Sequence, residues 1–98
     1  MNRSKLQVCT EILCHLASKG PMNLYSLSER VNLKEAQLNQ HLTLLKDSGL
    51  IRIQNFGNFK TFFELTESGL TVLKMYRSLL SEAQDSQRNE LKTIGIQL

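Results

Sequence analysis

Residues 32–51 read NLKEAQLNQHLTLLKDSGLI, and this stretch decides the fold of the chain. Asn32 is a favourable N-cap residue, and Glu35 three positions later completes a capping box. Gly49 supplies the left-handed residue that commonly ends a helix. We therefore predict a helix over residues 33–48 with both ends marked by the sequence.

The predicted helix has two different faces. Leu38, Leu42 and Leu45 recur at helical spacing and form an apolar stripe, and His41 lies beside that stripe as an expected packing residue. Amide side chains pair with adenine edges, and small side chains contact the thymine methyl group. We therefore predict that the outer face reads bases in the major groove, with a solvated polar face as the alternative. The short, uncharged residues of this outer face are Ala36, Gln37, Asn39, Gln40 and Thr43.

Two further helices are predicted before this stretch. The first spans residues 4–19, with Ser4 as its N-cap and Gly20 as its left-handed stop. The second is short and spans residues 23–31, with Asn23 as its N-cap. A short helix, a tight turn and a longer helix follow the helix-turn-helix order.

A β-hairpin is predicted after the helix over residues 33–48, which is the recognition helix of this arrangement. Residues 50–55 and 59–65 have strand-like composition, and the Asn-Phe-Gly-Asn sequence at residues 55–58 gives a strong turn signal. Phe56 at the tip is expected either to pack back on the hairpin or to insert at a nucleic-acid surface. Three helices followed by a hairpin form the winged-helix arrangement, in which the hairpin is the wing.

The recognition helix and the wing supply the candidate DNA contacts. Lys34 is a candidate phosphate ligand at the start of the helix, where backbone N–H groups add to it. Arg52, Asn58 and Lys60 on the wing are candidates for minor-groove or phosphate contact, although exposed hairpins are commonly polar. The predicted DNA-binding residues are Lys34, Gln37, Asn39, Gln40, Thr43, Arg52, Asn58 and Lys60.

A long helix is predicted from Thr66, its N-cap, to about residue 89. A helix that projects beyond its own small core must bury its apolar stripe elsewhere, and a second copy of the chain is the simplest partner. We therefore predict a homodimer, with a winged helix-turn-helix domain over residues 1–65 and a dimerisation helix and tail over residues 66–98. The predicted dimer interface consists of Leu73, Tyr76, Leu80 and Ala83.

The composition fits one small basic domain. The chain has 98 residues, a net charge of +3 and a pI of about 9.1. This basic excess permits nucleic-acid binding without demanding it. Arg3 and Lys5, at the N-terminal end, are further candidates for phosphate contact.

The sequence offers little for catalysis or metal binding. Cys9 and Cys14 lie five residues apart on a predicted helix and point in different directions, so we expect reduced thiols, with an intersubunit disulfide as the alternative. His15 and His41 belong to no ligand cluster. We predict no enzyme activity, no metal, no cofactor and no small-molecule ligand. No apolar run reaches the roughly 18–20 residues of a membrane span, which favours a cytoplasmic, nucleoid-associated protein.

Two runs of sequence carry a family resemblance. LYSLSERVNLKEAQLNQHLTLLKDSGLI at residues 24–51 and FELTESGLTVLKMYRSLL at residues 63–80 resemble the small archaeal winged-helix DNA-binding proteins. Within them, GLI at residues 49–51 is similar to the family's start of the wing, and LTESG at residues 65–69 to its link before the last helix. The resemblance implies an antiparallel coiled-coil dimer. His41 stands where this group often has an aromatic residue.

Together these features predict a mainly α fold with a small β-hairpin (α+β). The expected function is that of a homodimeric protein that binds double-stranded DNA, either as a sequence-specific transcriptional regulator or as an architectural protein. The alternative is a winged-helix module that binds another protein and not DNA. Glu29, Glu35 and Asp47, near the predicted DNA face, keep this alternative open.

Overall fold

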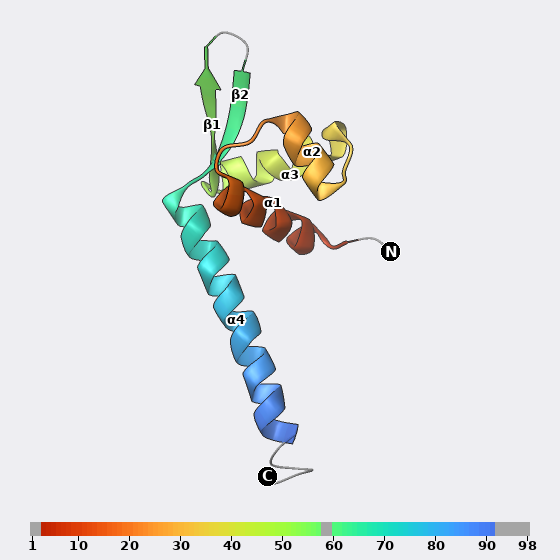
Figure 1. The fold of residues 1–98 in the computed structure, drawn as a ribbon, viewed down its shortest axis with the longest axis vertical. Coiled ribbons are helices and arrows are strands. Elements are labelled where there is room, and N and C mark those ends of the chain that lie inside the picture. Colours follow the sequence, from red (N-terminus) through yellow and green to blue (C-terminus); the bar gives the residue numbers. More distant parts are fainter. Residues whose placement is uncertain (1–2, 58–59, 92–98) are drawn as a thin grey trace.

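The computed structural model describes residues 3–57 and 60–91, with side chains described up to residue 81. The described chain is mainly helical with one two-stranded antiparallel sheet, as expected for a winged helix (Figure 1). Helices α1, α2 and α3 lie together beside the sheet, and α4 extends away from them (Figure 1). The elements are α1 Lys5–Lys19, α2 Leu24–Val31, α3 Glu35–Asp47, β1 Ile51–Phe56, β2 Lys60–Leu65 and α4 Glu67–Leu91.

The first two helices begin as the sequence predicts. The Ser4 hydroxyl oxygen accepts the Gln7 backbone N–H at 3.1 Å, and the Gln7 side chain accepts the Ser4 backbone N–H at 2.7 Å. The Asn23 side chain accepts the Ser26 backbone N–H at 2.8 Å. Gly20 ends α1 with a φ of 82°. Both predicted N-caps and the glycine stop of α1 are therefore confirmed.

The start of α3 differs from the prediction. Asn32 does not cap α3 but ends α2, in the left-handed region at a φ of 61°, and its backbone N–H donates to the Ser28 carbonyl. The N-cap of α3 is Lys34, whose side chain caps no backbone N–H within the described chain. Asparagine tolerates the left-handed conformation that this tight turn requires. The predicted capping box with Glu35 was therefore wrong, and α3 starts two residues later than expected.

The core draws on every element. Ile12 of α1, Leu27 of α2 and Leu38 of α3 are fully buried. The segment before α2 also joins the sheet, because Met22 and Phe63 exchange backbone hydrogen bonds of 3.0 and 2.8 Å. This pairing holds the start of the helix-turn-helix against the base of the wing.

The wing is a short antiparallel hairpin with Ile51 opposite Leu65 and Phe56 opposite Lys60. Its strands begin and end within one residue of the predicted bounds. The Phe56 ring contacts Phe62 edge to face, with centroids 5.2 Å apart. Phe56 therefore packs back on the wing, although about half of its surface stays exposed.

The junction between the wing and α4 is tightly packed. The Thr66 hydroxyl accepts the Gly69 N–H at 3.0 Å, which confirms the predicted cap, and donates to the Gly49 carbonyl at 2.7 Å. A Cβ on Gly69 would lie 2.1 Å from the Leu50 carbonyl oxygen, so only glycine fits there. One turn further on, Leu73 is 1% exposed and lies in the core. The first turns of α4 are thus fixed to the rest of the domain.

Candidate nucleic-acid interface

All the sequence-predicted contacts on α3 are exposed. Gln37 and Gln40, three residues apart, both line a hollow between α1 and α3. Asn39 and Thr43 lie further round the helix, because successive residues are separated by about 100°. Lys34 is also exposed, at the start of the helix. The predicted base-reading residues therefore follow one another round a single exposed face of α3.

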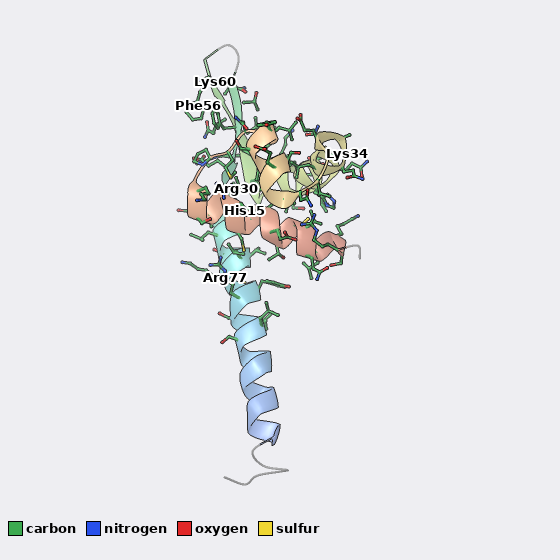
Figure 2. The ribbon with its side chains drawn as sticks, turned by 45° about the vertical axis from the view of Figure 1, so that its right-hand side comes forward. His15, Arg30, Lys34, Phe56, Lys60 and Arg77 are labelled. Atoms are coloured by element: carbon green, nitrogen blue, oxygen red, sulfur yellow. The ribbon has the colours of Figure 1, made fainter. Side chains whose placement is uncertain are left out.

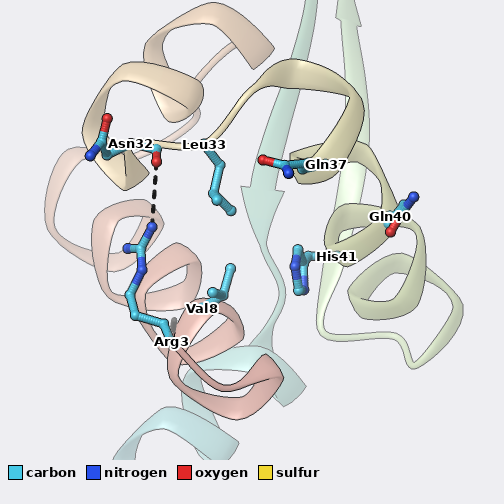
Figure 3. Close-up of a pocket in the computed structure, with 7 residues that line it drawn as sticks. All are labelled: Arg3, Val8, Asn32, Leu33, Gln37, Gln40 and His41. Carbon is cyan, nitrogen blue, oxygen red and sulfur yellow. Dashed lines mark hydrogen bonds between the residues drawn. The ribbon is translucent and has the colours of Figure 1, made fainter. Parts of the chain in front are cut away.

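The hollow beside α3 contains about 610 Å³ and has a mixed lining. Gln37 and His41 point into it, opposite Leu33 and Val8, whereas Gln40 points outward from its rim (Figure 3). His41 is half-buried, in agreement with its expected position beside the apolar stripe. Gln40 is therefore better placed than Gln37 to reach a ligand in front of α3.

The wing carries two exposed cations, and one of them, Arg52, forms an ion pair. The Arg52 Nε donates to Glu64 Oε1 at 2.6 Å, and the Gln54 amide donates to the same oxygen at 3.1 Å. The hydrogen bond from Arg52, and then that from Gln54, hold the pKa of the Glu64 carboxyl below its ordinary range. Lys60 is exposed, whereas Asn58 lies outside the described residues. Lys60 is thus a better phosphate candidate than Arg52, whose charge is largely balanced.

A second hollow, of about 390 Å³, joins α2, the start of α3 and the wing. Tyr25, Glu35 and Lys60 all line it. Tyr25 is 62% exposed. It was not among the predicted DNA contacts, because the pattern of α2 indicated only which residues are buried, such as Leu24 and Leu27. The available signal was an aromatic residue on the outer side of an amphipathic helix. Its hydroxyl makes Tyr25 a further candidate for contact with a nucleic-acid strand.

The candidate surface spans the width of the domain. Figure 2 shows Lys34 at one side of the domain and Phe56 and Lys60 at the tip of the wing. Glu29 and Glu35 are exposed in the same region and oppose an anion there. The glutamates therefore offset part of the positive charge of Lys34 and Lys60, and uncharged hydrogen-bonding side chains make up most of the rest of this surface.

The outer face of α4 differs from the predicted seam. Leu73 is 1% exposed and packs in the core of its own chain, so it offers almost no surface to a second chain. Tyr76 is half-buried, Leu80 is exposed, and the Ala83 side chain lies outside the described residues. A shallow hollow lined by Thr71, Lys74, Met75, Ser78 and Leu79 runs along the helix. Among the described side chains of α4, the large apolar ones that are exposed are Leu70, Val72, Met75, Leu79 and Leu80.

Other chemistry is sparse in the described residues. Cys9 and Cys14 are both free thiols, and burial raises the pKa of Cys9. Among the side chains that the structure describes, no three of His, Cys, Asp or Glu gather as metal ligands. In the described part of the chain, no helix is both long and apolar enough to cross a membrane.

Comparison with known proteins identifies the family. A model of the winged helix-turn-helix family matches residues 2–84. The chain belongs to this family. A sequence search of curated proteins found no match.

Solved structures share the fold at low sequence identity. MepR, a transcription regulator of the Staphylococcus aureus multidrug efflux pump MepA, has a TM-score of 0.77 and 15% identity over 86% of this chain. This chain spans 64% of that MepR chain. ZitR, a zinc-responsive MarR family member of Lactococcus lactis, has a TM-score of 0.68 and 17% identity over 99% of this chain and 68% of its own.

A shorter solved structure matches about two thirds of the chain. The Zalpha domain of Carassius auratus PKZ, solved in complex with Z-DNA, has a TM-score of 0.59 and 19% identity. The match covers 65% of this chain and 100% of that domain. The predicted winged-helix fold is thus confirmed. The solved structures that share this fold include transcription regulators.

Proposed function

We propose that the protein is a homodimeric regulator that binds double-stranded DNA, with α3 in the major groove and the wing beside it. The observation that carries this proposal is the outer face of α3. Gln37, Asn39, Gln40 and Thr43 are all exposed on it and all uncharged. Such side chains suit hydrogen bonding to base edges, whereas a solvated face would normally carry more charge. The Zalpha domain, which shares the fold, was solved in complex with Z-DNA, and this supports DNA binding in general.

The decisive experiment is selection of bound sequences from a random pool of duplex DNA. Recovery of a palindromic motif supports a dimeric sequence-specific regulator, because a two-fold dimer reads two related half-sites. Tight binding without a motif supports an architectural, nucleoid-associated role in the cytoplasm. No retained DNA at low salt would contradict both forms of the proposal.

A salt titration then tests the phosphate contacts. Each phosphate neutralised by Lys34, Lys60 or another cation adds about 0.9 to the slope of log affinity against log salt. We expect a clear salt dependence. A flat profile would exclude DNA backbone binding by these lysines.

The dimer would form through the outer face of α4. Val72, Met75, Leu79 and Leu80 are exposed there and would be covered by the α4 helix of a second copy. We propose the antiparallel arrangement of the archaeal proteins that the sequence resembles. Sedimentation at micromolar concentration tests the dimer, and a monomer at that concentration would contradict it.

A protein-binding role is the second candidate. Glu29 and Glu35 oppose DNA near α3, and Phe56 keeps about half of its surface exposed at the wing. In this case α3 would read no bases, and the wing with α4 would hold a partner protein. Absence of DNA retention together with a stable 1:1 protein complex would favour it.

A further inference from the structure

The guanidinium of Arg3 connects α1 to the helix-turn-helix. Its NH1 group donates to Glu11 Oε1 at 2.7 Å. Its NH2 group donates to the Val31 carbonyl at 2.6 Å and to the Asn32 carbonyl at 3.5 Å. Figure 3 shows the guanidinium pointing at the turn between α2 and α3. Arg3 was predicted to contact phosphate, but the groups of its guanidinium donate hydrogen bonds to the protein.

The turn that Arg3 contacts is also held by hydrogen bonds with Ser28. The Asn32 and Leu33 backbone N–H groups both donate to the Ser28 carbonyl, and the Ser28 hydroxyl donates to the Leu33 carbonyl. The last carbonyls of a helix have no partner within it, and a cation there is favourable. Arg3 supplies both a donor and a charge at this point. Its planar fork reaches Glu11 and the turn at once, which a lysine ammonium does less well.

Apolar side chains lie near these hydrogen bonds. The hollow of about 610 Å³ lies between this end of α1 and α3. Val8 and Leu33 line it, and both also belong to or pack against the core. Arg3 lines the same hollow and adds a polar contact between α1 and the turn.

We infer that Arg3 is a positioning residue, which sets the recognition helix by fastening the α2–α3 turn to Glu11 of α1. The effect on DNA contact rests on the proposed DNA-binding function. The contact between Arg3 and the turn does not depend on that function. Gln37 and Gln40 begin only a few residues beyond the turn, so a looser turn displaces them from the bases. This role differs from phosphate binding by the N-terminal arm. The two roles predict different effects of Arg3 substitutions on the salt dependence of DNA binding.

The first test compares DNA binding of Arg3→Gln, Arg3→Lys and Lys19→Gln. Lys19 is an exposed cation at the opposite end of α1 and serves as the charge control. We expect both Arg3 variants to bind about tenfold more weakly, because charge-assisted hydrogen bonds are lost in each, with an unchanged salt slope. If Arg3→Lys binds like the natural protein and Arg3→Gln lowers the slope by about 0.9, Arg3 contacts a phosphate and the inference is wrong.

The second test uses the sign of a charge change at Glu11. Glu11→Ala removes an acidic group, so electrostatics alone predicts tighter DNA binding. Positioning predicts binding weakened by about threefold, because Arg3 loses one anchor. Glu29→Ala is the control, since Glu29 is exposed on α2 and its removal should tighten binding. Tighter binding by both variants would overturn the inference.

The third test needs no DNA. Hydrogen exchange of the Asn32 and Leu33 backbone amides reports opening of the turn directly. We expect exchange in Arg3→Gln to be about tenfold faster at these amides, with the Leu38 amide of α3 as an internal reference. Unchanged exchange would overturn the fastening even if DNA binds. If no DNA binds to the natural protein, the proposed function fails, and the exchange result still decides the role of Arg3.

Discussion

Helices α3 and α4 both contribute leucines to the core but expose opposite kinds of surface. The α3 helix buries Leu38, Leu42 and Leu45, and its outer side carries amides and a threonine. The α4 helix buries Leu73 in the same core, yet its outer side carries methionine and branched apolar residues. An amphipathic pattern thus locates the core side of each helix. What the other side exposes indicates the chemistry of its partner.

The comparison separates two proposed partners. Uncharged polar groups on α3 gain most from a partner that offers a fixed pattern of donors and acceptors, as base edges do. Apolar groups on α4 gain most from removal of water by another apolar surface. Changes to the outer face of α3 should therefore leave the dimer unaffected, whereas loss of the dimer through α4 also weakens binding to a palindromic site that needs both half-site contacts.

The largest expected effect concerns the attachment of α4. Gly69→Ala places a Cβ against the Leu50 carbonyl oxygen, so the junction must shift, and we expect a loss of about 3 kcal/mol in unfolding free energy. Gly49→Ala is the matched control, because it meets no atom within 4 Å and suffers only backbone strain of about 1 kcal/mol at a φ of +76°. Urea unfolding measures both. Equal losses would show that the close contact does not constrain α4.

The next effect tests the outer face of α4. Met75→Glu with Leu79→Glu puts two charges into the proposed dimer interface. We expect the dimer dissociation constant to rise about thirtyfold, or about 2 kcal/mol, because charges are costly to bury. Analytical ultracentrifugation measures this change. Lys74→Glu tests whether charge alone is responsible, and an unaltered dimer in the double variant would place the interface elsewhere.

A smaller effect is expected on the outer face of α3. Gln40→Ala should weaken binding to a selected sequence about tenfold while leaving random DNA unchanged, because a base contact is worth about 1–3 kcal/mol. Lys60→Ala should weaken both sequences alike and lower the salt slope by about 0.9. Fluorescence anisotropy on selected and random duplexes distinguishes them. If Gln40→Ala weakens both duplexes equally, Gln40 reads no base.

The smallest effect concerns the wing. The pKa of Glu64 is lowered in the folded protein, so the Arg52–Glu64 pair contributes stability above the unfolded pKa and loses it as pH falls through the folded pKa. We expect the Glu64 carboxyl carbon to titrate below the ordinary range in an NMR series, and Glu64→Gln to abolish this step. Titration at or above the ordinary glutamate range would show that the pair does not persist in solution.

Local sequence signals predicted most of the fold. The caps at Ser4, Asn23 and Thr66 were found correctly, because N-capping depends on side chains within three residues of the helix start. The Asn32 assignment failed because one residue between two helices suits both roles. Its conformation was decided by the closure of the turn, which a local pattern does not specify.

The candidate site was less predictable. The exposure of Gln40 followed from helical spacing, but the ion pair of Arg52 with Glu64 depends on strand register. The Tyr25 position beside Lys60 depends on how α2 meets the wing. Contacts between residues far apart in sequence carry no local periodic signal, so they were missed.

The sequence by itself determined the elements of this protein and which side of α1, α2 and α3 is buried, because helical period and capping are local properties. The tertiary structure decided where the remaining side chains act. It placed Leu73 in the core of its own chain, and it turned the Arg3 guanidinium toward the α2–α3 turn. The physical reason is packing geometry: burial of a leucine or the partners of a guanidinium depend on neighbouring elements, and only the assembled fold defines those neighbours.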